Sequence, residues 1–453
     1  MDKRRQRIIY ILSDIFMAAL AWLLFNLLRY YEVAHYQFGS LTDYLLFYQV
    51  LKGQILIPLF WLILYYFSGY YNKPFGKSRV NELFSTFITV SIGSVLIFFI
   101  VVLNDLPESF QVYYDLLFAL WGIQFFLTYL SRAFITNYSL RKVRRHEWFE
   151  NVLIVGTGEN ATKMCDNLDK LGYNVVGCVG VVDDTFKESD DIENIIKQHK
   201  VDQIFVAVNS NDVVPTLYKL YKYRLPVKVM VDKNNFLSKA RINTIQGIPV
   251  VDITENNFSE AEKNIKLFMD KVISLCVLIL LSPMYLYISL RVKAESKGSV
   301  FFRQERIGYR GKPFTIYKFR TMYDGASSKG PLLTMVDDDR VTPFGRFLRK
   351  YRIDEFPQFW NVLKGDMSIV GPRPEQRYYI EQIVQKAPYY YLLHNVRPGI
   401  TSLGMVKFGY AETVDKMIDR LAFDIIYYEN MSIVLDIKIL IYTVKIVFTG
   451  KGV

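Results

Sequence analysis

The sequence predicts a membrane α-helical bundle of four spans, followed by a Rossmann-like α/β domain and then by a second α/β domain that begins with a re-entrant helix. Three observations lead to this prediction: four apolar stretches near the start, a strand–glycine loop–helix alternation from about residue 151, and a fifth apolar stretch interrupted by Ser282-Pro283. The chain is 51% hydrophobic and 16% aromatic, which is a high apolar content for a soluble protein. Its 453 residues are too many for one hydrophobic core. The expected domains are residues 1–140, 150–255 and 265–453.

The cysteines and the net charge narrow the classes of partner. Cys165, Cys178 and Cys276 have neither metal-ligand nor disulfide spacing, so the sequence indicates no zinc site and a reduced compartment. The net charge of +11 comes largely from basic residues at the ends of apolar segments, as found beside an anionic membrane surface. Membrane lipids are therefore an expected partner, and nucleic acid is not.

Each of the four apolar stretches is close to the length that crosses a bilayer: residues 8–28, 54–70, 83–103 and 113–135. Lys and Arg precede the first, lie between the second and third, and follow the fourth, whereas the loop 104–111 has none. The positive-inside rule then predicts that both ends of the bundle are cytoplasmic. Asp14 lies within the first stretch, and we expect it to face a neighbouring helix rather than to carry function.

The second region begins as a dinucleotide-binding βαβ unit does. An apolar strand at 152–155 runs into Gly-Thr-Gly-Glu-Asn-Ala at 156–161, and a second strand at 175–182 ends in two acidic residues. Gly156 and Gly158 would let the backbone approach a pyrophosphate, and Asp183 would bond a ribose.

The match to the fingerprint is partial, because Ala161 replaces the third glycine. Two features argue against a dinucleotide-dependent redox domain. Glu159 would place a carboxylate beside the phosphates, and we find no Tyr-x-x-x-Lys pair for hydride transfer after the glycine loop. The sequence predicts a Rossmann-like regulatory or scaffold domain, with nucleotide binding left open.

The fifth apolar stretch, residues 272–290, has Ser282-Pro283 at its centre and basic residues on both sides. Pro283 removes a backbone donor and kinks a helix, and the Ser282 hydroxyl can satisfy a freed carbonyl. A helix that enters, bends and returns keeps both basic flanks on one side of the membrane, whereas a Pro-kinked span does not. The flanking charges favour the re-entrant helix.

The region after this stretch places cations where they can contact phosphate oxygens. Basic and aromatic residues alternate over 301–308 and 313–322, and further arginines flank an acidic pair and lie within a Pro-Arg-Pro turn. Lipid head groups are the alternative ligands for such cations. The candidates for substrate binding are Arg303, Arg306, Lys318, Arg320, Arg349 and Arg373.

The acidic pair Asp354-Glu355 is the strongest chemical signal in the chain. Two adjacent carboxylates between arginines can hold a divalent metal, accept a phosphoryl group, or do both. Pro357 is a natural first residue of a helix, so the pair is expected just ahead of a helix N-terminus, where anions are favoured.

From about residue 271 onward, the sequence resembles the bacterial sugar transferase family, the monotopic polyprenyl-phosphate phosphoglycosyl transferases. Four amino-terminal spans and a Rossmann-like domain resemble the large form of that family. The motifs that carry the resemblance are Ser282-Pro283, Gln304-x-Arg306-x-Gly308, Lys318-Phe-Arg-Thr-Met322, Asp354-Glu355-x-Pro357-Gln358, Asn361-Val-Leu-Lys-Gly-Asp-Met367 and Val370-Gly-Pro-Arg-Pro374.

This resemblance implies a reaction at the cytoplasmic face of the bacterial inner membrane. A sugar-1-phosphate of glucose or galactose type would pass from a UDP-sugar to undecaprenyl phosphate, which releases UMP and initiates a capsular polysaccharide, exopolysaccharide or O-antigen. Asp354 would attack the β-phosphorus to form a covalent aspartyl intermediate, and Glu355 would ligate metal or position the nucleophile. Mg²⁺ is the implied cofactor, held through Asp354 or Glu355. The oligomeric state stays open, a homodimer included.

Two departures and two rival functions accompany the resemblance. Met405 stands where a Gln is frequent in the family, and Tyr351-Arg352 replaces a small hydroxylated residue before the acidic pair. The main rival is a non-catalytic membrane scaffold or regulator of polysaccharide export, in which the acidic pair is dispensable. The second is a membrane-bound NAD-dependent epimerase or dehydratase, which requires the Tyr-Lys pair.

Overall fold

The computed structural model divides into two compact units, Met1–Phe149 with Ser259–Ile265, and Glu150–Phe258 with Lys266–Val453. It describes residues 3–72, 79–104, 109–145, 147–156, 158–170, 173–182, 185–186, 189–208, 212–230, 242–245, 248–254, 256–325 and 338–449.

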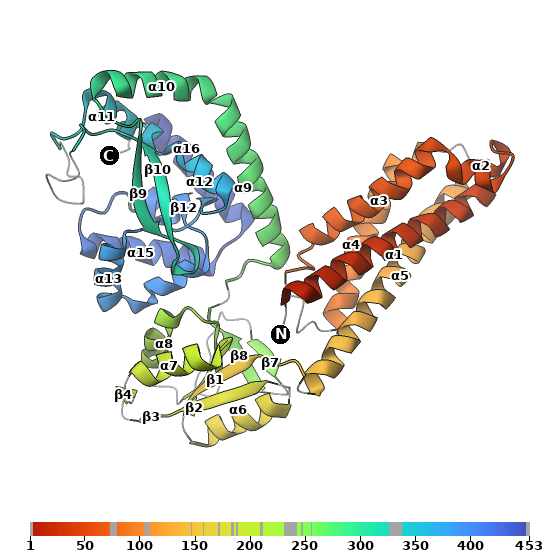
Figure 1. Ribbon diagram of the computed structural model, residues 1–453, viewed down its shortest axis with the longest axis horizontal. Coiled ribbons are helices and arrows are strands. Elements are labelled where there is room, and N and C mark those ends of the chain that lie inside the picture. Colours follow the sequence, from red (N-terminus) through yellow and green to blue (C-terminus); the bar gives the residue numbers. More distant parts are fainter. Residues whose placement is uncertain are drawn as a thin grey trace. The chain divides into compact units, whose positions relative to one another are not determined.

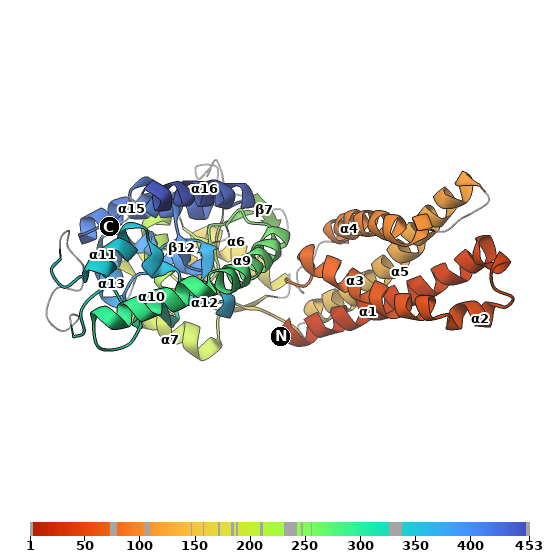
Figure 2. The same ribbon diagram turned by 90° about the horizontal axis from the view of Figure 1, so that it is seen from above.

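The first unit is a helical bundle whose four long helices are each long and apolar enough to cross a membrane, as predicted. Helix α1 packs against α3 and α5, and α4 packs against α5 (Figure 2). Many large apolar side chains of these helices are exposed, which suits lipid contact. The elements are α1 (Lys3–Glu32), η1 (Ala34–Tyr36), α2 (Leu41–Leu46), α3 (Tyr48–Phe67), α4 (Arg79–Ile100), η2 (Val102–Asn104) and α5 (Phe110–Arg144).

A buried ion pair joins α1 to α5 inside this bundle. Arg132 Nη2 lies 2.7 Å from Asp14 Oδ2, and both side chains are only 1% exposed. Tyr71 donates its hydroxyl to Asp14, and Arg132 donates to Thr86. Because a buried charge without a partner is costly, the pair fixes how the helices pack, which supports the structural interpretation of Asp14.

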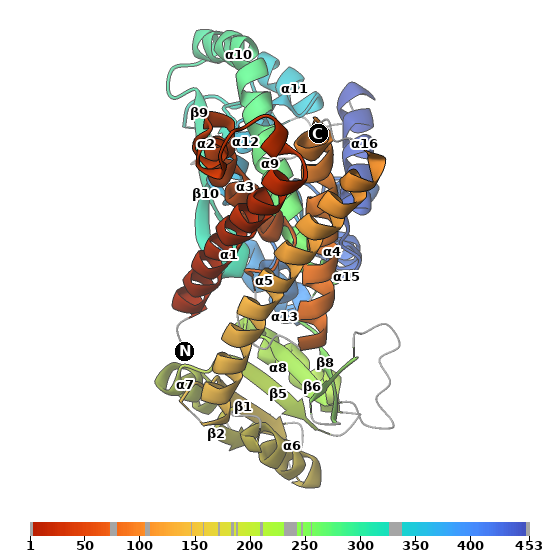
Figure 3. The same cartoon turned by 90° about the vertical axis from the view of Figure 1, so that its right-hand side faces the viewer.

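The first part of the second unit is a six-stranded sheet in the order β2-β1-β5-β6-β8-β7 (Figure 3). Strands β2, β1, β5 and β6 are parallel, whereas β8 and β7 form an antiparallel edge. The elements are β1 (Asn151–Gly156), α6 (Gly158–Lys170), β2 (Asn174–Val179), β3 (Val181–Val182), β4 (Thr185–Phe186), α7 (Ser189–His199), β5 (Gln203–Ala207), α8 (Val213–Leu220), η4 (Tyr221–Tyr223), β6 (Val227–Met230), β7 (Ile242–Ile245) and β8 (Ile248–Asp252).

Helices cover both faces of this sheet, as parallel strands require. Val152 and Ile154 of β1 pack against α6, whereas Leu153 and Val155 pack in the cluster that includes α7 and α8 (Figure 1). This alternation explains why β1 reads as an unbroken apolar run, and it agrees with the Rossmann-like domain that the sequence predicts.

The glycine fingerprint has a structural explanation at its first position. A Cβ on Gly156 would overlap the carbonyl oxygen of Ala207 on the adjacent strand, so only glycine fits there. Gly158 begins α6, and Asp183 lies outside the described residues. Nucleotide binding at these residues stays a prediction.

The expectation that no Tyr-x-x-x-Lys spacing follows the glycine loop is wrong, because this spacing does occur later in this domain. Tyr218 and Lys222 have this spacing, but the Tyr218 ring packs against Tyr389 of the C-terminal region, with ring centroids 5.9 Å apart. Lys222 in turn lies over the ring of Tyr223. These contacts favour packing roles for both residues.

The C-terminal region wraps helices around two small sheets and a core of apolar side chains. Strands β9 and β10 form an antiparallel hairpin, and β11 pairs in parallel with β12. The elements are α9 (Glu260–Leu280), α10 (Ser282–Glu295), β9 (Phe301–Ile307), η5 (Tyr309–Gly311), β10 (Pro313–Phe319), α11 (Pro343–Lys350), η7 (Ile353–Glu355), α12 (Gln358–Lys364), β11 (Ser368–Val370), α13 (Arg377–Lys386), η8 (Pro388–Asn395), β12 (Gly399–Thr401), α14 (Leu403–Lys407), α15 (Val414–Glu429) and α16 (Ile433–Thr449).

The predicted kink in the fifth apolar stretch is confirmed. Helices α9 and α10 meet at 62° with the break at Leu281 (Figure 1). Pro283 has no N–H to donate to the carbonyl of Ile279, and the Ser282 hydroxyl donates to that carbonyl instead at 2.7 Å. The serine therefore satisfies the group that the proline leaves without a donor.

Arg224 of the Rossmann-like domain contacts the hairpin turn of the C-terminal region. Its guanidinium lies over the ring of Tyr391, 5.4 Å from the ring centroid, and it fills the space that a Cβ on Gly311 would need. Gly311 has φ +66° and belongs to η5, which joins β9 to β10. The turn of the hairpin thus depends on a residue of the preceding domain.

Candidate active site

The acidic pair lies in a single 3₁₀ turn, η7, between α11 and α12. Arg352 adopts a left-handed conformation, with φ 54°, and turns the chain into η7. Helix α12 begins at Gln358 with Pro357 as its N-cap, so the helix starts one residue later than predicted. The expectation that the pair directly precedes a helix is otherwise met.

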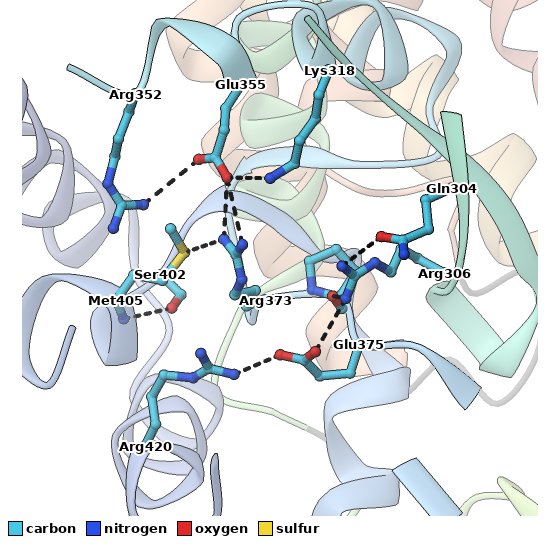
Figure 4. Close-up of polar contacts among 11 residues, drawn as sticks. Gln304, Arg306, Lys318, Arg352, Glu355, Arg373, Glu375, Ser402, Met405 and Arg420 are labelled. Atoms are coloured by element: carbon cyan, nitrogen blue, oxygen red, sulfur yellow. Dashed lines mark hydrogen bonds and ion pairs between the residues drawn. The ribbon is translucent and has the colours of Figure 1, made fainter. Parts of the chain in front are cut away.

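Three cations surround the carboxylate of Glu355, which is 6% exposed. Lys318 Nζ lies 2.7 Å from Oε1, Arg373 Nη1 lies 3.4 Å from the same oxygen, and Arg352 Nη1 lies 3.6 Å from Oε2 (Figure 4). Burial alone would raise the pKa of Glu355, but the three cations outweigh burial and hold this pKa well below its usual range. Glu355 is therefore ionised and neutralised by its neighbours.

The neighbouring carboxylate of Asp354 has a different environment. It is 8% exposed, and within the described part of the chain its side chain makes no hydrogen bond or ion pair. Burial raises the pKa of Asp354 to about 6, the charge of Glu355 adds to this rise, and Lys318 opposes it. Two adjacent carboxylates thus have pKa values shifted in opposite directions, as is typical of carboxylate pairs with different roles.

Both carboxylates line a pocket of about 670 Å³. All six cations predicted to bind substrate also line this pocket, and so do Arg340, Arg352 and Arg420, which the sequence analysis did not assign to substrate. Such a concentration of positive charge suits a substrate with several phosphate oxygens. Phosphate contact by any single residue stays a prediction.

The six predicted cations differ in whether their side chains already bond to other groups of the protein. Arg303 is exposed on β9, and Arg349 donates to Thr321 at 2.9 Å. Lys318 and Arg373 are held by Glu355, and the charge of Lys318 also acts on Asp354. Burial lowers the pKa of Arg306, and the nearby carboxylate of Glu375 offsets only part of this shift.

Arg320 lines the pocket, but its guanidinium already donates to the backbone. Its Nη1 donates to the carbonyl of Lys297 at 2.9 Å, and its Nη2 donates to the carbonyl of Ser296 at 2.6 Å. These carbonyls lie where α10 ends. The geometry favours Arg320 as an anchor for the end of α10 rather than as a phosphate ligand.

A second charged cluster, centred on Glu375, was missed by sequence reasoning. Arg420 Nη2 lies 2.6 Å and Arg306 Nη1 lies 3.2 Å from the carboxylate of Glu375. Figure 4 shows Arg373 between this cluster and Glu355. Glu375 directly follows the Pro-Arg-Pro motif, which is a signal that could have found it, whereas Arg420 lies on α15 without a motif around it.

Of the acidic pair, Asp354 is the carboxylate better suited to a metal ion. The described residues contain no group of three or more His, Cys, Asp or Glu side chains arranged to hold a metal. Glu355 faces Lys318, Arg352 and Arg373, and a further cation there would be repelled. Asp354 also feels nearby cations, but it has no ion-pair partner among the described residues, so it is the residue of the pair that would hold Mg²⁺, and Glu355 is not favoured as a ligand.

A family model described as bacterial sugar transferase matches residues 261–450. The UDP-glucose:undecaprenyl-phosphate glucose-1-phosphate transferase of Escherichia coli (strain K12) is 33% identical over 326 residues, which are 68% of this chain and 70% of that protein. The chain belongs to the bacterial sugar transferase family. The resemblance drawn from the motifs is thereby confirmed.

Two further relatives of this bacterial sugar transferase extend the comparison. The UDP-glucose:undecaprenyl-phosphate glucose-1-phosphate transferase of Klebsiella pneumoniae is 35% identical over 298 residues, covering 62% of this chain and 63% of that protein. The UDP-N-acetylgalactosamine-undecaprenyl-phosphate N-acetylgalactosaminephosphotransferase of Aeromonas hydrophila is 42% identical over 188 residues, 42% of this chain and 44% of that protein. The match thus spans less than two thirds of the length of each of these two relatives.

A second family model, described as CoA-binding domain, matches residues 66–218 of this sugar transferase. That range runs from the end of α3 to α8 and includes the first strands of the Rossmann-like sheet. The acidic pair and the lining of its pocket lie outside it, within the match to the sugar transferase model.

Proposed function

We propose that this protein transfers a sugar-1-phosphate from a UDP-sugar to undecaprenyl phosphate and releases UMP. The proposal rests on the difference between the two acidic residues. Asp354 has no ion-pair partner among the described residues, whereas Glu355 forms ion pairs with three cations. A free carboxylate next to concentrated positive charge suits attack on a phosphorus that carries negative oxygens. The relatives are named for the same class of reaction.

The proposed reaction has two steps at one phosphorus atom. In the first, an oxygen of ionised Asp354 bonds to the β-phosphorus, and the bond from that phosphorus to the bridging oxygen breaks, so that UMP leaves with the electron pair. In the second, a phosphate oxygen of the lipid bonds to the same phosphorus, and the Asp354 carboxylate leaves. Lys318 and Arg373, held in place by Glu355, stabilise the charge on the equatorial oxygens in both steps.

Mg²⁺ is the proposed cofactor, and Asp354 is the residue that would hold it. When bound, it neutralises charge on the diphosphate and on the departing UMP. Glu355 keeps a separate role in this proposal, because it orients Lys318 and Arg373.

We also propose that α9 and α10 form a re-entrant element with both flanks on the cytoplasmic face. On α9, Asp270 accepts hydrogen bonds from the Ser368 hydroxyl at 2.7 Å and from the Ile369 amide at 3.2 Å. On α10, Glu295 accepts a hydrogen bond from the Phe344 amide at 3.1 Å. Both arms of the bent pair thus pack on the same C-terminal region, which supports a helix that returns to the side it came from.

A reconstituted assay tests the reaction. Purified full-length protein in bilayer nanodiscs, with undecaprenyl phosphate and Mg²⁺, is expected to convert a radiolabelled UDP-sugar into labelled lipid and UMP. Asp354→Asn is expected to lower this rate by about 10⁴-fold, because the amide is not a nucleophile. Asp366→Asn, which changes a carboxylate that does not line the pocket, is the matched control and is expected to keep wild-type activity.

Two outcomes of this assay would contradict the proposal. Activity retained in Asp354→Asn would exclude the covalent step, and a wild-type protein that releases no UMP would favour the scaffold alternative. The same assay with UDP-glucose, UDP-galactose and UDP-N-acetylgalactosamine identifies the sugar, for which we propose the glucose or galactose type. Mass spectrometry of a peptide that contains Asp354 is expected to show the added phosphosugar when no lipid acceptor is present.

A further inference from the structure

A hydrogen bond connects the bent membrane helix to the acidic turn. Tyr285, in the first turn of α10 after the break, donates its hydroxyl to the carbonyl oxygen of Phe356 at 2.8 Å. Phe356 directly follows Glu355 and caps η7. The same carbonyl accepts the amide of Phe359, so the Tyr285 hydroxyl bonds at the junction of η7 and α12.

The other end of the turn belongs to the same apolar cluster as the helix. Ile353, the first residue of η7, packs in the cluster that contains Tyr285, Phe319 and Leu348. The Tyr285 ring also lies against that of Phe319, with centroids 5.4 Å apart. Helix α10 therefore bonds the turn after Asp354-Glu355 and shares an apolar cluster with the residue before this pair.

The two substrates of the proposed reaction place different demands on this turn. A UDP-sugar is soluble in water and can enter the pocket from the aqueous side. The phosphate of undecaprenyl phosphate is confined to the plane of the lipid head groups by its chain. Its approach to a phosphosugar on Asp354 depends on how far Asp354 lies from that plane, and a misplacement of about 1 Å can slow a reaction by about 10²-fold.

We propose that Tyr285 is a positioning residue that sets the distance between Asp354 and the break between α9 and α10. Its main effect is on the second step, the transfer of the phosphosugar to the lipid phosphate. This inference rests on the proposed function, and it adds a residue of the membrane helix to the determinants of the second step. The hydroxyl is the group of Tyr285 that this proposal requires. Without the hydroxyl, the ring would still pack on Phe319, but the turn would be free to shift along α10.

The two steps can be measured separately in nanodiscs. The first is the burst of UMP in the absence of lipid acceptor, and the second is the loss of labelled phosphosugar from the protein after undecaprenyl phosphate is added. Tyr285→Phe is expected to slow the second step about tenfold, the usual consequence of one lost hydrogen bond, and to leave the burst within about twofold of wild type.

Tyr287→Phe is the matched control, because Tyr287 lies on the same helix, is 59% exposed and makes no hydrogen bond within the described residues. It is expected to change neither step.

A soluble acceptor separates positioning from a general loss of structure. A short-chain polyprenyl phosphate that dissolves in water is not confined to the head-group plane, so the defect of Tyr285→Phe is expected to shrink to about twofold with this acceptor. Equal slowing of both steps, or equal slowing with both acceptors, would overturn the proposal, as would a Tyr285→Phe protein with wild-type kinetics. A wild-type protein that gives no burst would instead refute the proposed function itself.

Discussion

Lys318 Nζ lies 2.7 Å from Glu355 Oε1, yet the carboxylate of Asp354, one residue earlier, has no such partner among the described residues. The pair therefore divides into a neutralised carboxylate and an available one. Because both are buried, this division comes from the placement of cations and not from exposure to solvent.

The pKa of Asp354 predicts how the first step depends on pH. With this pKa raised to about 6 before metal and substrate bind, the ionised nucleophile is scarce below pH 6, so the rate of the UMP burst at sub-saturating UDP-sugar should rise about tenfold per pH unit there and level off above it. Lys318 lowers this pKa, so Lys318→Met should move the inflection to higher pH. Rapid-quench measurement of the burst from pH 5 to pH 8 checks both expectations.

Lys386→Met, at an exposed lysine far along the chain, is the control and should leave the inflection in place. A shift of the inflection to lower pH in Lys318→Met would contradict the assignment of this inflection to Asp354.

Arg320→Met should destabilise the protein while Arg303→Met should not. Arg320 donates to two backbone carbonyls at the end of α10, and charged hydrogen bonds of this kind contribute about 1.5–3 kcal/mol each to the free energy of unfolding. Arg303 is exposed on β9, so its replacement should change stability by less than about 0.5 kcal/mol. Denaturation of both variants in the same detergent measures the difference. Equal stability of the two would show that Arg320 does not anchor α10.

The contact between Gly311 and Arg224 should appear as coupling in a double-mutant cycle. Gly311→Ala introduces a Cβ where the Arg224 guanidinium lies and also places alanine at φ +66°, so it should destabilise the protein by more than the roughly 1 kcal/mol expected from backbone strain alone. Arg224→Ala removes the overlap, so adding it to Gly311→Ala should recover the steric part but not the strain. Thermal unfolding of the two single variants and the double variant gives the coupling energy. A coupling energy of zero would mean that the two residues do not touch.

Asp270→Ala should weaken the attachment of α9 to the C-terminal region. The substitution leaves the Ile369 amide without its buried acceptor, whereas the Ser368 hydroxyl keeps the Val370 carbonyl as an acceptor at 2.9 Å, so the change should cost about 1–3 kcal/mol. Hydrogen exchange should rise at β11 before it rises in the Rossmann-like sheet, because β11 carries both donors. Asp419→Ala, at an exposed position on α15, provides the comparison and should leave exchange unchanged.

The sequence predicted those features that local chemistry determines. Ser282-Pro283 bends a helix wherever it occurs within one, and the Asp354-Glu355 pair with its arginines lies in one short segment. The six candidate cations do line one pocket, because the motifs that carry them meet in the fold.

The features that sequence reasoning missed depend on contacts between distant segments. Lys318 is 37 residues from Glu355, and Arg420 is 45 residues from Glu375, so neither pairing can be read from spacing. Arg320 was predicted to bind phosphate because it is one of the cations that alternate with aromatic residues, and only the fold shows that its guanidinium donates to the end of α10. The different roles of Asp354 and Glu355 have the same origin, since adjacent residues share their neighbours in the sequence but not in space.

The close approach of Gly156 to the carbonyl of Ala207 has an evolutionary consequence. Any larger residue at this position would push two parallel strands apart, so selection for a folded sheet preserves the glycine whether or not a nucleotide ever binds. A lineage that abandoned an ancestral cofactor would still carry this part of the fingerprint in its descendants.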